Sequence, residues 1–271
     1  MRKSIGRNLV LGLVTAVLLA GACKSGGDKV ELTDGNAAAA AAAKRTADPG
    51  TVRFALRYDA ERGTPINVTG EGSFDFDKAL GGMRVKLAEQ ETNVVIAGDT
   101  IYGKLPGILG QGPKPWLAFN ATNGNSLLGG LDQLVKLADP RQELSRLGLA
   151  SDMKKVGTEK IRGVDTVHFQ GIVDLSDAAL AKLPAAVRTE ARELREEFGL
   201  QSYPIDLWLD NAGRVRRLQS ALSGKEGDQP VTVKTRIDLF SFGDKITVTI
   251  PPASQVQDAS EFGVPTDSST P

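Results

Sequence analysis

The sequence has little of the residues that carry nucleophilic and metal chemistry, with one cysteine and one histidine among 271 residues. With a single cysteine no disulfide can form within the chain, so packing has to hold the fold together. A zinc site usually takes several histidine or cysteine ligands, which this chain cannot supply. We therefore expect neither a metal nor a cofactor.

The chain also has no excess of positive or negative charge, and it has few aromatic residues. The chain balances 33 Lys and Arg against 33 Asp and Glu, and aromatic residues make up 5%. A neutral surface gives no electrostatic attraction to nucleic acid, so we expect no nucleic-acid partner. The apolar fraction is ordinary at 41%, which allows a sizeable core.

The motifs of several enzyme classes are also missing. No serine stands in a Gly-x-Ser-x-Gly turn, and no glycine-rich stretch continues as a phosphate loop or a dinucleotide fingerprint. His168 follows the period of a strand and is interpreted as a half-exposed strand residue. A glycosidase needs only two carboxylates, so the acidic residues leave that alternative open. We predict a binding protein and not an enzyme.

The single cysteine, Cys23, directly follows an export signal. Residues 2–7 carry positive charge, residues 9–20 are uncharged and apolar, and Ala20-Gly21-Ala22 forms a small-residue cleavage site. The apolar stretch is shorter than the roughly 20 residues that span a bilayer. Small residues before a cysteine resemble the lipobox of bacterial lipoproteins, which implies acyl chains such as palmitate on Cys23. The alternative is an ordinary secretory signal with a spare thiol.

Composition divides the chain into four parts. Residues 1–22 are expected as the lipoprotein signal peptide, and residues 23–34 as a flexible polar tether. Residues 35–250 are expected to form one domain, and residues 251–271, rich in Ser, Asp, Thr and Pro, a disordered tail. This organisation places the protein on the extracytoplasmic face of the cell membrane, held by lipid.

Apolar periodicity predicts an α+β domain with an antiparallel sheet, because helices interrupt the strands without alternating with them. Alternation with a period of two indicates about eleven strands, at residues 51–58, 66–76, 83–87, 94–97, 100–104, 116–119, 153–158, 164–175, 203–209, 214–222 and 231–240. Helices are expected at residues 37–45, 127–137, 140–148 and 180–198. Arg214, Arg216 and Arg217 form either a solvated strand face or a contact for phosphate headgroups.

Several stretches of this chain resemble a known family. They are residues 163–171 (Gly-Val-Asp-Thr-Val-His-Phe-Gln-Gly), residues 204–210 (Pro-Ile-Asp-Leu-Trp-Leu-Asp) and the hairpin at residues 213–216. Together with the acylated cysteine and the order of elements, they resemble the actinobacterial LppX/LprA/LprF/LprG lipoproteins. The resemblance implies the LolA/LolB-like fold, a strongly curved antiparallel half-barrel whose concave face is covered by helices.

The resemblance also implies a function. Members of this family bind acyl chains of lipids or lipoglycans in an apolar cavity and carry them across the cell envelope. In this chain the lining would come from inward strand and helix positions, namely Phe54, Leu56, Val68, Phe74, Val85, Leu87, Leu131, Val135, Leu183 and Val187. We expect the protein to be a monomer, with an envelope transporter as a candidate binding partner. Two alternatives stay open, a sensor lipoprotein that binds a protein partner and a hydrolase of envelope glycans.

Overall fold

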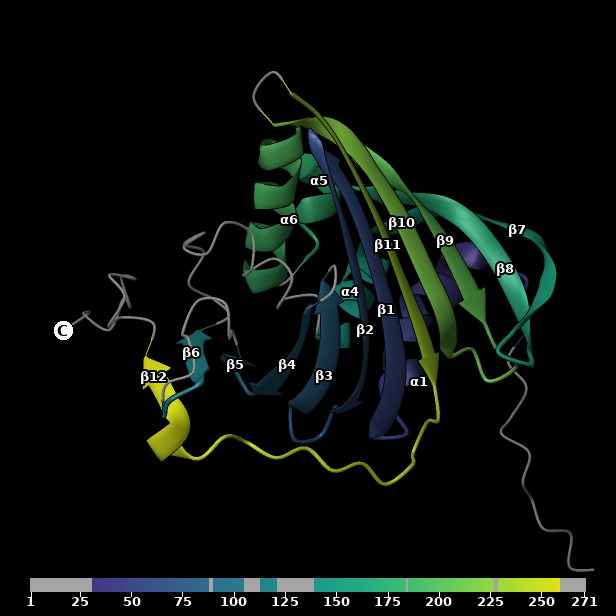
Figure 1. Ribbon diagram of the computed structural model, residues 1–271. Helices are drawn as coiled ribbons and strands as arrows, with labels where there is room; N and C mark the ends of the chain where they lie inside the picture. Colours follow the sequence, from purple (N-terminus) through teal and green to yellow (C-terminus); the bar gives the residue numbers. More distant parts are fainter. Residues whose placement is uncertain are drawn as a thin grey trace, which may run out of the picture.

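The computed structural model describes residues 31–87, 90–104, 113–120, 139–183, 185–226 and 229–258. These residues form a mixed α+β structure built on one large sheet (Figure 1). The expected helix at residues 127–137 lies outside the described residues, as do the signal peptide and most of the tether.

The sheet has twelve strands in the order β12-β6-β5-β4-β3-β2-β1-β11-β10-β9-β8-β7. Neighbours pair antiparallel except β12 and β6, which are parallel. The strands are β1 (Thr51–Arg62), β2 (Thr64–Asp75), β3 (Leu80–Leu87), β4 (Gln90–Ala97), β5 (Thr100–Lys104), β6 (Trp116–Asn120), β7 (Ala150–Ile161), β8 (Val164–Asp174), β9 (Ser202–Leu209), β10 (Val215–Glu226), β11 (Gln229–Phe240) and β12 (Val256–Asp258). The prediction of an antiparallel α+β domain is confirmed for these residues.

The sequence predicted about eleven strands, and the described residues form twelve. The additional strand is β12, which lies within the stretch that was expected as a disordered tail. Residues 251–258 instead contain the short 3₁₀ helix η2 (Ala253–Gln255) followed by β12. The pairing of β12 joins Val256 to Trp116, residues far apart in the sequence. A three-residue strand has too little periodicity to be recognised from sequence.

The described helices are α1 (Gly35–Ala47), α4 (Pro140–Ser145), α5 (Asp177–Leu180) and α6 (Ala185–Phe198), and the 3₁₀ helix η1 (Arg146–Leu149) continues α4. Helix α1 begins because the Asp34 carboxylate accepts hydrogen bonds from the N–H groups of Asn36 and Ala37. The single helix expected at residues 180–198 was wrong. The sequence has a proline at position 184, and proline cannot continue a helix, so α5 and α6 are separate.

The helices pack against one side of the sheet, which we call the helix face (Figure 1). The Thr46 hydroxyl of α1 accepts a hydrogen bond from the Val215 N–H of β10 at 2.9 Å. At the end of α6, Phe198 lies so close to Gly224 that an added Cβ would come within 2.2 Å of the Phe198 carbonyl oxygen. Side chains of Val52, Phe54 and Leu56 belong to this face and are buried. The opposite side is called the open face.

Candidate functional site

The structure brings the six predicted strand residues of the lipid site onto the helix face. Cross-strand pairing aligns Phe54 with Gly72, Leu56 with Gly70, and Gly70 with Val85. Directly paired residues in an antiparallel sheet point to the same side, and alternate residues of one strand share a face. The six are Phe54, Leu56, Val68, Phe74, Val85 and Leu87, of which all but the half-buried Leu87 are at most 3% exposed.

The four predicted helix residues are only partly described. Leu183, between α5 and α6, is buried at 8% exposure, and its Cδ2 lies 3.8 Å from the position that a Cβ on Gly148 would take. Leu131, Val135 and the side chain of Val187 lie outside the described residues. Whether the predicted residues line a cavity for acyl chains therefore remains a prediction.

Glycines on the helix face make room for large neighbours. A Cβ added to Gly81 would lie 2.4 Å from Cδ2 of Phe74, and one added to Gly70 would lie 2.7 Å from the Met83 sulfur. A Cβ on Gly72 would likewise lie 2.7 Å from the Phe54 ring. These large side chains fold down onto the sheet at the glycines. The apolar side chains on the helix face of β1–β3 are therefore closely packed against the backbone of the sheet.

A row of hydroxyl groups crosses this apolar face. Tyr58 pairs with Thr235, and Thr235 pairs with Ser220, so the three side chains lie side by side on β1, β11 and β10. Thr235 and Ser220 are buried, and the Ser220 Oγ has no hydrogen-bond partner among the described residues. Further along, burial raises the pKa of the Tyr203 phenol to about 12, so Tyr203 stays neutral at physiological pH.

His168 lies on the open face, where its neighbours hold it in place. Its ring stacks on Trp208 with centroids 4.1 Å apart, and Nε2 lies 2.8 Å from the Asp206 carboxylate. The Trp208 indole N–H donates to Glu159. Among the described residues no three His, Cys, Asp or Glu side chains gather as a metal site. This cluster joins strands β7, β8 and β9.

The arginines of the β9–β10 hairpin are also engaged within the fold. Arg214 and Arg216 both donate to Asp210 at 2.9 Å, and both guanidinium groups lie over the Phe242 ring. Arg217 donates two hydrogen bonds to Asp238, at 2.6 and 2.8 Å. The arrangement matches neither a free solvated face nor a row of cations ready for phosphate. Arg214 and Arg216 stabilise the β9–β10 hairpin, and Arg217 joins β10 to β11.

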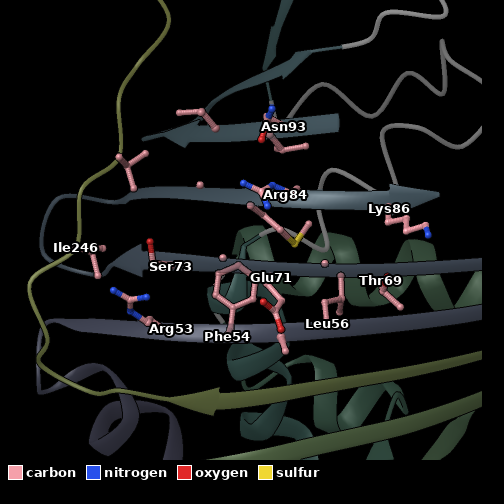
Figure 2. A pocket seen from close by; sticks show the side chains of 18 of the residues that line it. Arg53, Phe54, Leu56, Thr69, Glu71, Ser73, Arg84, Lys86, Asn93 and Ile246 are labelled. Carbon is pink, nitrogen blue, oxygen red and sulfur yellow. The ribbon is translucent and has the colours of Figure 1, made fainter. Parts of the chain in front are cut away.

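The open face carries a hollow of about 980 Å³ that the sequence did not indicate. Its floor is the outward side of β1–β4 and its wall is the extended chain at residues 246–249 (Figure 2). Polar and charged side chains predominate on the floor, among them Arg53, Thr69, Glu71, Ser73, Arg84, Lys86 and Asn93. Between the helices and the sheet, the described residues enclose a void of about 20 Å³ beside Tyr203, which is room for one water.

Comparison with solved structures finds several that are similar to this arrangement. The crystal structure of lipoprotein LppX from Mycobacterium tuberculosis matches 79% of this chain and 99% of its own, with a TM-score of 0.46 and 14% identity. LprF from Mycobacterium bovis matches 80% of this chain and 96% of its own, with a TM-score of 0.44 and 15% identity. The chain is similar in fold to LppX and LprF. A LolA superfamily protein from Nitrosomonas europaea is similar over 76% of this chain and 91% of its own, with a TM-score of 0.31 and 8% identity.

Sequence comparison adds a distant relative. No protein-family model matches the chain. An uncharacterised 31.2 kDa protein from the rplA-rplJ intergenic region of Streptomyces griseus is 25% identical over 157 residues, which is 56% of this chain and 50% of that protein. The chain thus matches half the length of this relative. In the described part of the chain no helix is long and apolar enough to cross a membrane.

Proposed function

We propose that this protein is a membrane-anchored lipoprotein that binds acyl chains of lipids or lipoglycans on the helix face and carries them across the cell envelope. Cys23 holds the acyl chains of the anchor, and the short polar tether lets the domain reach the membrane surface. The sheet curves into the half-barrel that the family resemblance implies, and the helices cover its concave side.

The observation that carries the proposal is the continuous apolar face of β1–β4. It collects all six predicted strand residues on the helix face. Each methylene removed from water contributes about 0.8 kcal/mol, so an acyl chain on such a surface gains affinity without any charged contact. The hydroxyl row of Tyr58, Thr235 and Ser220 adds polar groups to this face, to which an ester group or a sugar can form hydrogen bonds. The unpartnered Ser220 Oγ is a free hydrogen-bond donor for it.

A sensor function is the second candidate. In that case the same fold binds lipid and reports to a protein partner, so lipid binding changes a protein affinity and moves no lipid between membranes.

The test is recovery of lipid from the purified protein. The full-length chain is expressed in an actinobacterial host, extracted in mild detergent and examined by native mass spectrometry. We expect bound acyl lipid in the wild type, less in Leu183→Trp, and an unchanged amount in Val156→Trp, whose site on β7 is 50% exposed. The unfolding midpoints of all three are compared. Wild-type protein without acyl lipid contradicts the proposal, and equal loading of a folded Leu183→Trp excludes Leu183 from the lining.

A further inference from the structure

The chain after β11 runs as an extended strap, residues 244–251, past one end of β1–β4 at the border of the open face (Figure 2). The strap is fixed at both ends. The Gly243 N–H donates to the Thr51 carbonyl at 2.9 Å, and beyond the strap β12 pairs with β6. Ile246 and Val248 are half-buried, and both line the hollow. Gly82 permits this contact, because a Cβ there would lie 3.3 Å from the Val248 methyl group.

The strap has the sequence of a strand without the pairing of one. Residues 246–250 read Ile-Thr-Val-Thr-Ile, and β-branched residues of this kind favour extended chains. No backbone hydrogen bond joins residues 245–251 to another backbone group in the described part of the chain. Thr247 and Thr249 are exposed. An extended segment with unpaired N–H and C=O groups is a template for another strand.

The floor beside the strap carries two arginines that form no salt bridge with a described residue. Arg53 and Arg84 are exposed and border the hollow from β1 and β3 (Figure 2), and neither forms an ion pair with a described residue. By contrast, Arg57 on the same face donates to Asp59 at 2.7 Å. Lys86 is paired in register with Glu91, so these two charges offset each other. Glu71 is paired in register with Arg84 in the same way. The charged side chains that line the hollow, Arg53, Arg84, Lys86, Glu71 and Glu91, therefore leave it with an excess of one positive charge.

We propose that the hollow and the strap form a binding site for an extended acidic peptide segment of a partner protein. The segment adds a strand to the strap through backbone hydrogen bonds, and its carboxylates bind Arg53 and Arg84. This is β-strand addition, in which the backbone supplies affinity and alternate side chains supply specificity. A free backbone edge recognises a peptide and offers nothing to an acyl chain. The site lies on the face opposite the proposed lipid site and does not depend on it.

The test uses the full-length chain in detergent and a labelled peptide of about ten residues, alternating valine and threonine with two aspartates. Binding is followed by fluorescence anisotropy, and exchange of the Thr247 and Thr249 amides by hydrogen–deuterium exchange. We expect saturable binding and slower exchange of the strap amides. The double variant R53Q/R84Q raises Kd at least about tenfold, since two charge-assisted contacts are lost. The matched control R57Q, which removes a cation outside the hollow, changes Kd by less than about twofold.

Three comparisons can overturn the proposal. Two peptides, N-methylated at the odd or at the even backbone nitrogens, block one edge of the strand each. At least one of them must lose binding, because it cannot pair with the strap, and equal binding of both excludes strand addition. A peptide with lysine in place of aspartate must bind more weakly, and equal binding excludes the role of Arg53 and Arg84. Vesicles of phosphatidylglycerol are the third probe. If they bind through the two arginines while the peptide gives no saturation below about 1 mM, the site belongs to a lipid surface.

Discussion

Replacement of Phe74 and Gly81, singly and together, tests whether the helix face is packed where the structure shows contact. Phe74 is 0% exposed, and its ring lies 5.3 Å from that of Phe76 and beneath the Arg141 guanidinium. Gly81, its register partner on β3, has no room for a methyl group, because the Cβ would lie 2.4 Å from the Phe74 ring. Phe74→Ala removes the ring from this contact, whereas Gly81→Ala adds a methyl group to it.

The magnitudes follow from these contacts. Phe74→Ala leaves a cavity and lowers the free energy of unfolding by about 3–5 kcal/mol if the surroundings stay in place. Gly81→Ala overpacks the site and lowers it by about 1–3 kcal/mol. In the double variant the ring is absent and the new methyl group fills part of its space. The double variant therefore loses less free energy of unfolding than the sum of the two single losses, by about 1–3 kcal/mol. A coupling of this size is expected of residues in contact.

Urea unfolding of the four proteins, followed by circular dichroism, measures this coupling. Gly148→Ala serves as the control partner, since its Cβ would meet only Leu183, at an ordinary 3.8 Å. Phe74→Ala and Gly148→Ala should add within about 0.5 kcal/mol. Strict additivity of Phe74→Ala and Gly81→Ala refutes the contact. A loss below about 1.5 kcal/mol for Phe74→Ala shows instead that the ring borders open space.

Three further predictions concern an ion pair, a helix cap and the anchor. Burial raises the pKa of Asp210, but hydrogen bonds from Arg214 and Arg216 outweigh it and lower the pKa below its usual value. Asp210→Asn should therefore lower the free energy of unfolding by about 3 kcal/mol at pH 7, and urea titrations should show the difference shrinking below about pH 4, where the unfolded carboxyl protonates. Asp34→Ala removes the cap of α1 and should cost about 1 kcal/mol, with faster amide exchange in its first turn. Cys23→Ser should move the protein from the membrane to the soluble fraction, and continued attachment excludes the lipid anchor.

Sequence patterns predicted the strands because side-chain alternation is a local property of the chain. In β1, Val52, Phe54 and Leu56 alternate with Arg53, and the structure buries the first three and exposes the arginine. The shared face of the strand residues follows from alternation and register together. The proline at position 184 was equally visible in the sequence, and its effect on the helix could have been predicted.

The open face could not be predicted in the same way, because its hollow depends on a distant segment. The pattern of β1 and β3 makes Arg53 and Arg84 ordinary solvent-facing strand residues, and residues 246–250 were assigned to no strand. The Thr51–Gly243 hydrogen bond and the β6–β12 pairing hold the strap beside β1–β3. Pairing between residues so far apart is decided by loop closure and packing, which periodicity does not record.

The two proposed sites use opposite faces of the same strands, and this has a thermodynamic consequence. Phe54 and Val85 belong to the helix face, while their neighbours Arg53 and Arg84 belong to the open face. A ligand that shifts the backbone of β1 or β3 therefore moves side chains on both sides. Coupling between two binding equilibria is reciprocal, so lipid and peptide must change each other's affinity by the same factor. If lipid leaves the peptide affinity unchanged, the two sites are independent, as expected of a carrier. If lipid changes the peptide affinity, the sheet transmits lipid binding to the peptide site, as expected of a sensor.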